Sequence, residues 1–194
     1  MAQAGTQPHS SWCSLMAFPH KKIAARLIAG DATTVTEQIG AALEDVVSRT
    51  LCSLPGLRVL KRDFVNRAGS SEFDLFLFNN SRLSPIEFLP DFLLVECKNW
   101  AARVDSATVR DFVGKLLATH QKVGILVAAN GITGDAAEQT AANDIIRQSF
   151  DAHDIKIIVL KRSDIEAFRS KEDIVLFLQE RYGEACLRST LIER

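Results

Sequence analysis

The chain alternates between segments whose apolar residues recur every three to four positions and short segments in which apolar residues dominate. The first helical pattern starts at Thr36, continues through Leu51 and ends before the turn pair Pro55-Gly56. Residues 57–65 and 72–78 then predict two consecutive strands, because they are rich in apolar and aromatic residues and are separated by a Gly-Ser turn.

A second pattern follows in which helices and strands alternate. After a loop over 79–90, the sequence predicts a strand at 92–98, a helix from Ser106 through Leu117, a strand at 123–129, a helix at 135–150, a strand at 155–160 and a helix at 171–182. The early hairpins require antiparallel neighbours, whereas strands separated by helices require parallel crossovers. The predicted fold class is therefore α/β, an αβα sandwich around a central mixed β-sheet.

Composition agrees with a single folded domain. The chain has 194 residues, of which 47% are hydrophobic and 24% are charged. We divide it into an N-terminal lead-in at 1–30, partly disordered or forming one helix, a domain at 31–185 and a C-terminal tail at 186–194. The formal net charge of −1 predicts no bulk attraction to polyanions or to anionic membranes.

The four cysteines and the absence of long apolar segments indicate the compartment. Cys13, Cys52, Cys97 and Cys186 are far apart, which predicts free thiols in a reducing environment. No apolar segment approaches the roughly 20 residues that span a bilayer, and the first 20 residues lack a signal-peptide pattern. We therefore expect a cytoplasmic protein with no membrane contact.

Two acidic residues stand on strands that are predicted to pair. If 72–79 and 91–98 form a hairpin, Asp74 lies opposite Glu96, with Cβ atoms about 5 Å apart. Lys98 shares the face of Glu96, while Cys97 points to the other face. Two carboxylates so close stay ionised only with a cation between them, and oxygen ligands suit Mg²⁺ or Mn²⁺. The alternative is that each is an ordinary surface charge.

These residues resemble a known family. Glu44 on the first predicted helix, Asp74 in Phe73-Asp74-Leu75 and the triplet Glu96-Cys97-Lys98 are similar to the motif of the PD-(D/E)xK nuclease superfamily, and within it the Mrr-type restriction endonuclease-like domains. The strand and turn at 123–133, ahead of an alanine-rich helix, extend the resemblance, which covers roughly 36–160.

The resemblance implies metal-dependent cleavage of a phosphodiester. Asp74, Glu96 and the backbone carbonyl of Cys97 would hold Mg²⁺ or Mn²⁺, and Lys98 would orient the attacking water or stabilise charge on the phosphate. Glu44 would reach the metal or its water shell, or be a solvated acid instead.

One departure concerns the helix after the triplet. The glutamine and tyrosine that many relatives carry there are absent from 106–120. Arg110 or Lys115 could supply a substrate-facing group, although both are more simply interpreted as solvated charges on an amphipathic helix.

Clustered basic residues are the candidates for contacts with a polyanion. The nucleic-acid contacts that we predict are Arg58, Lys61, Arg62 and Arg67, in a segment that also holds Arg49 and a single acid, Asp63. A second basic stretch contains Lys21, Lys22 and Arg26. The alternative for the first segment is a charged strand face that discourages edge pairing.

The functional expectation is a Mg²⁺- or Mn²⁺-dependent endonuclease that acts on DNA in defence or repair, as a homodimer or within a larger complex. A dimer would allow double-strand cleavage, although the sequence does not establish one. The alternatives are an inactive nucleic-acid-binding or partner subunit with the same fold and, with little support, a small-molecule phosphodiesterase.

Overall fold

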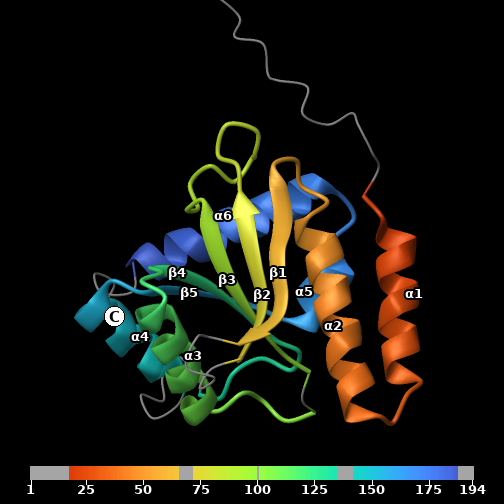
Figure 1. Cartoon of the computed structure of the whole chain (residues 1–194), viewed down its shortest axis with the longest axis horizontal. Coiled ribbons are helices and arrows are strands. Elements are labelled where there is room, and N and C mark those ends of the chain that lie inside the picture. Colours follow the sequence, from red (N-terminus) through yellow and green to blue (C-terminus); the bar gives the residue numbers. More distant parts are fainter. Residues whose placement is uncertain (1–17, 66–71, 100, 135–141, 188–194) are drawn as a thin grey trace, which may run out of the picture.

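The computed structural model describes residues 18–65, 72–99, 101–134 and 142–187, which fold into three layers (Figure 1). The elements are α1 (His20–Asp31), α2 (Thr36–Leu51), β1 (Leu57–Val65), β2 (Glu72–Asn79), β3 (Phe92–Lys98), α3 (Ser106–Ala118), β4 (Val123–Ala128), α4 (Ala142–His153), β5 (Lys156–Leu160), α5 (Arg162–Ala167) and α6 (Lys171–Leu187). None of the helices among these described residues is both long and apolar enough to cross a bilayer.

The described strands form one five-stranded mixed sheet in the order β1-β2-β3-β4-β5. The pairs β1·β2 and β2·β3 are antiparallel, and β3·β4 and β4·β5 are parallel. The chain crosses from β3 to β4 through α3 and from β4 to β5 through a segment that ends in α4, as parallel pairing requires. This arrangement confirms the predicted fold class.

Helices cover both faces of the sheet and make two hydrophobic clusters. One cluster packs the inner faces of α1, α2, α5 and α6 against side chains such as Leu75 and Val95. The other packs α3 and α4 against the opposite face, with Leu94 and Leu126. Figure 1 shows α1 with α2 to one side of the sheet, and α3 with α4 to the other. Strand β4 is buried along its whole length, as its continuous apolar run predicts.

The structure adds one helix, α5, to the predicted order. Helix α1 lies at the end of the lead-in, for which one helix was an open alternative, and it joins the first cluster through Ile23 and Leu27. Helix α5 has only six residues, so it is too short to show a helical period in sequence. Of the helix predicted at 135–150, the part from 142 onward is observed, and 135–141 lies outside the described residues. Residues 1–17 also lie outside them.

Helix α3 packs closely onto β4 because Gly124 has no side chain. A Cβ atom at Gly124 would lie 2.7 Å from Cζ of Phe112 and 2.9 Å from Cδ2 of Leu116. Both of these side chains are fully buried, so neither can move away without disturbing the core.

We expect the substitution Gly124→Ala to lower the free energy of unfolding by roughly 1–3 kcal/mol, because the added methyl overpacks this contact. Gly114→Ala on α3 is the matched control, since a Cβ there meets nothing within 4 Å. The control should raise stability by up to about 1 kcal/mol through helix propensity. Urea unfolding measures both effects, and equal stability of the two variants would contradict the expected packing constraint.

Candidate active site

The predicted hairpin register between β2 and β3 is confirmed. Leu75 pairs with Val95 and Phe78 with Phe92, so one further step places Asp74 across from Glu96. Regular alternation breaks at Asp74, because Phe73 packs in the cluster of Leu94 whereas Leu75 packs in the opposite one. Asp74 thus lies at the point where the side chains of β2 stop alternating regularly between the two faces of the sheet.

Glu96 is a buried carboxylate held by two lysines. The side chain is 2% exposed, and its Oε1 atom accepts from Nζ of Lys98 at 2.8 Å and from Nζ of Lys115 at 2.7 Å. Lys98 therefore shares the face of Glu96, as strand alternation predicts. Two cations in contact with one carboxylate offset the cost of burying its charge.

Lys115 corrects the interpretation from sequence. Its side chain is 9% exposed, so it is not a solvated charge of an amphipathic helix. The ammonium lies 5.8 Å from the centre of the Phe73 ring and 3.5 Å from Asp111. Arg110, the other residue considered on this helix, is exposed. Sequence pattern could have marked Lys115 because it lies in the apolar row of α3 with Phe112 and Leu116.

Asp74 is held by the backbone of the neighbouring strand. Its Oδ2 atom accepts from the N–H of Cys97 at 2.6 Å. Burial raises the pKa of Asp74 to about 6, and the charge of Glu96 acts in the same direction, whereas the Cys97 N–H, Lys98 and Lys115 oppose the shift. The repulsion between the two carboxylates is therefore present in the folded chain.

Lys98 and Cys97 have environments that fit their positions on β3. Burial acts to lower the pKa of Lys98, but the hydrogen bond and charge of Glu96 more than offset it, so this pKa lies above its usual value. The Cys97 side chain packs against the opposite core cluster, as alternation predicts. Burial raises the pKa of its thiol, so Cys97 is a packing residue whose backbone faces the site. Cys52, Cys97 and Cys186 are free thiols, and Cys13 lies outside the described residues.

The Glu44 carboxyl contacts Asp63, and the sequence pattern did not predict this contact. Burial raises its pKa to about 8, and a hydrogen bond with Asp63 and the charges of Asp63 and Asp74 add to the shift, while Arg62 opposes it. Asp63 adopts a φ of 43°, an irregular point on β1 that brings this carboxyl to α2. Glu44 is therefore not a freely solvated acid, and Asp63 is a residue of the site that sequence reasoning missed.

A contact at the end of β3 fixes α2 beside these carboxylates. The Asn99 side chain donates to the carbonyl of Ile39 at 3.0 Å. Asn99 directly follows the strand that carries Glu96 and Lys98, whereas Ile39 lies near the start of the helix that carries Glu44. This hydrogen bond joins two segments that are 60 residues apart in sequence.

The carboxylates can be tested as ligands of a divalent cation. Within the described residues, no three side chains of His, Cys, Asp or Glu gather closely enough to hold a metal ion. The predicted inner donor set has only two carboxylates, from Asp74 and Glu96, with the Cys97 carbonyl. Glu96 Oε2 is buried and has no hydrogen-bond partner, which is unusual for a carboxylate oxygen. An unsatisfied oxygen beside a second repelling carboxylate fits a hard cation such as Mg²⁺ or Mn²⁺.

The predicted basic contacts on β1 point in different directions. Arg62 donates to the Ser48 hydroxyl on α2, while Lys61 lies over the Phe64 ring, 5.7 Å from its centre. Arg58 lies 5.2 Å from the centre of the Phe78 ring. Arg67 lies outside the described residues. Because β1 is the first strand of the sheet, protection of its edge and contact with a polyanion both stay open as roles for these side chains.

Comparison with known proteins gives the class of the domain. A family model described as a restriction endonuclease, of the Mrr catalytic type, matches residues 40–155. No curated protein and no solved structure matches the chain. The family match covers more than half of the chain and spans α2 through α4, including every carboxylate described above. The chain therefore belongs to the Mrr-type restriction endonuclease family.

We expect Lys115→Met to destabilise the chain by about 3 kcal/mol, because it removes one of two cations from a buried carboxylate. Adding Glu96→Gln to this variant should recover part of the loss, since the amide carries no charge. Arg110→Met on the same helix is the control and should change stability by less than about 0.5 kcal/mol. Urea unfolding of the four proteins is the measurement, and an unchanged stability of Lys115→Met would contradict the role of this ion pair.

The raised pKa of Glu44 predicts a pH dependence of stability in metal-free buffer. The folded chain holds a proton on Glu44 up to about pH 8, whereas an unperturbed glutamate releases it near 4.5. The folded state therefore binds more protons over this range, and stability must fall as pH rises from about 5 to 8. Asp74, with a pKa of about 6, adds to this decline at its acidic end.

Glu44→Gln should flatten that decline, so that the variant gains stability relative to the wild type at pH 8.5 but not at pH 5. Glu37→Gln, an exposed position on the same helix, should leave the profile unchanged. Urea unfolding at both pH values in EDTA is the measurement. Parallel profiles for the wild type and Glu44→Gln would show that Glu44 is an ordinary solvated acid.

Proposed function

We propose that this chain is a divalent-metal-dependent endonuclease that hydrolyses DNA phosphodiester bonds. The observation that carries the proposal is the position of Asp74 and Glu96 on adjacent strands, one step beyond the pair Leu75–Val95. Lys98 contacts the carboxylate of Glu96, and the chain belongs to the restriction endonuclease family. A role in defence or repair, and a location in the cytoplasm, belong to the same proposal.

Each side chain has a role that follows from its position. Asp74 and Glu96 would hold the metal together with the Cys97 carbonyl, and Glu96 would offer Oε2 because Oε1 is occupied by lysines. When bound, Mg²⁺ or Mn²⁺ would supply Lewis-acid polarisation of the phosphate and a lower pKa for a coordinated water. Lys98 supplies a fixed positive charge beside the reacting phosphate. Glu44, which is hydrogen-bonded to Asp63, would accept hydrogen bonds from the water shell of the metal or give up its own proton to bind there.

One observation favours a different function. Glu96 already has two cationic partners in the described structure, so its charge is compensated without a metal. A chain in which Lys115 permanently replaces the cation would keep the fold and bind nucleic acid without cleaving it. This binding subunit is the second candidate, and it is distinguished by metal-independent binding with no turnover.

The test is incubation of linear, circular and single-stranded DNA with the full chain in Mg²⁺, Mn²⁺ or EDTA. Asp74→Asn and Lys98→Ala should each reduce metal-dependent cleavage by about 100-fold or more, because each removes a metal ligand or the fixed charge. Linearised products from the circular substrate would identify an endonuclease. Thermal unfolding should show that both variants remain folded.

Arg82→Ala is the matched control, because it removes one exposed charge from the loop at the opposite end of the sheet. It should cleave like the wild type. Binding of DNA in EDTA with no products in either metal would overturn the nuclease proposal and support the binding subunit. Cleavage that persists in both site variants would place the activity elsewhere.

A further inference from the structure

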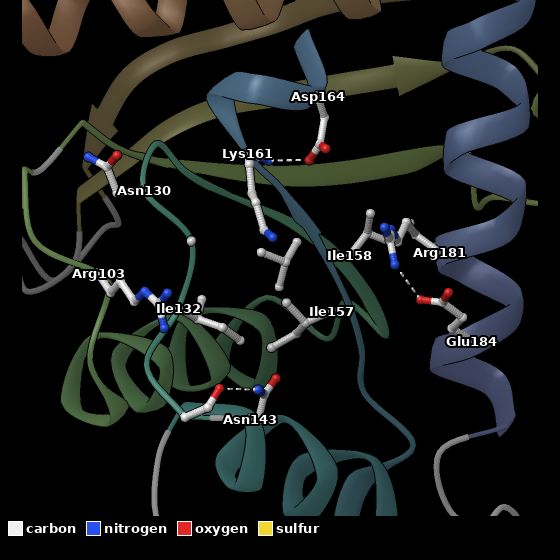
Figure 2. Close-up of a pocket in the computed structure, with 13 residues that line it drawn as sticks. Arg103, Asn130, Ile132, Asn143, Ile157, Ile158, Lys161, Asp164, Arg181 and Glu184 are labelled. Atoms are coloured by element: carbon white, nitrogen blue, oxygen red, sulfur yellow. Dashed lines mark hydrogen bonds and ion pairs between the residues drawn. The ribbon is translucent and has the colours of Figure 1, made fainter. Parts of the chain in front are cut away.

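A hollow lies at the β5 edge of the sheet (Figure 2). Its volume is about 280 Å³, just below the roughly 300–1,000 Å³ typical of pockets for whole small molecules. The turn after β4, strand β5 and helices α4 and α6 contribute its walls. A hollow of this size takes a single nucleotide unit rather than a duplex.

Two cations point into this hollow. Figure 2 shows the Arg103 guanidinium and the Lys161 ammonium directed into the space from the loop before α3 and from the end of β5. Neither side chain has an ion-pair partner among the described residues. Lys161 crosses Gly131 closely, since a Cβ atom at that glycine would lie 3.5 Å from Cε of Lys161.

The acids that line the hollow are already engaged. Asp164 accepts from the backbone N–H of Lys161 at 2.8 Å, at the first turn of α5. Glu184 accepts from Arg181 at 2.8 Å on α6. Arg181 matches the charge of Glu184, whereas Asp164 offsets one of the two inward cations. The lining of the hollow therefore keeps an excess of one positive charge, which favours an anion.

The sheet register connects this hollow to the candidate active site. Lys98 pairs with Ala128 in the parallel ladder, and Val127 pairs with Leu160, so Lys161 reaches the same level one residue later. The N–H of Arg162 donates to the Ala129 carbonyl at 3.3 Å, which continues the ladder beyond β5.

Lys161 and Lys98 also share a face of the sheet. Val159 and Leu126 pack against the cluster on the α3 and α4 face, and Lys161 lies two residues beyond Val159 in extended backbone. The Cα atoms of the two lysines therefore lie in one row across the sheet. They are about 10 Å apart, because two strand spacings separate β3 from β5.

We propose that Arg103 and Lys161 bind a backbone phosphate of the nucleic-acid strand whose scissile phosphate lies at Asp74, Glu96 and Lys98. This subsite rests on the proposed function. It would fix the direction of the strand across the carboxyl ends of β3, β4 and β5, and it reads no sequence because it contacts only the backbone. Ile132, a half-buried apolar side chain of the hollow, would pack against the sugar.

The salt dependence of DNA binding tests the subsite. Anisotropy of a labelled 20-base-pair duplex in EDTA measures affinity without cleavage, and the slope of log K against log salt counts the phosphates contacted. Lys161→Ala should reduce the magnitude of this slope by about 1 and weaken binding about fivefold at 0.15 M salt. Arg103→Ala should act similarly, and Lys161→Arg should restore the wild-type slope.

The control is Arg82→Ala, which removes the same charge at the far end of the sheet and should leave the slope unchanged. A Lys161→Ala protein that binds with the wild-type slope would overturn the subsite alone. A wild type that binds no DNA would overturn the proposed function and the subsite together. If Lys161→Ala keeps the wild-type slope and the molecular mass of the protein doubles as its concentration rises, the β5 edge binds a second copy of the chain. This result would also overturn the subsite.

Discussion

The compensation of the buried Glu96 carboxylate is the constraint on which the site depends. An isolated charge with 2% exposure would cost several kcal/mol, so its partners must be held by the fold itself. Lys98 lies on the same strand as Glu96, whereas Lys115 reaches the Glu96 carboxylate from α3, which covers that face of the sheet. The close packing of α3 on β4 at Gly124 therefore also sets the position of a charge in the site.

The other carboxylates of the site are arranged by departures from regular strand geometry. Asp63 has a positive φ, and Phe73 and Leu75 pack on opposite faces although they are two residues apart. These irregularities gather acids from β1, β2 and α2 near the end of β3. Burial and mutual repulsion raise the pKa values of Glu44 and Asp74, which stores an unfavourable interaction that a cation can relieve.

Much of the fold was predictable because its signals are local or nearly so. The uninterrupted apolar run of β4 indicated a strand covered on both faces, and the hairpin register followed from pairing the segments 72–79 and 91–98 end to end. Helix α5 was missed because six residues show no period. The domain boundaries and the roles of the site residues stay predictions, and so does contact of nucleic acid with Arg58, Lys61 and Arg62.

The sequence by itself determined the order of the main strands and helices, the register of the hairpin between β2 and β3 and the shared face of Glu96 and Lys98, because strand alternation and hairpin register depend on neighbours along the chain. Only the tertiary structure decided that Lys115 is buried on Glu96, that Asp63 meets Glu44, and that Lys161 lies level with Lys98. These contacts join separate elements, so they depend on packing distances that no local pattern contains.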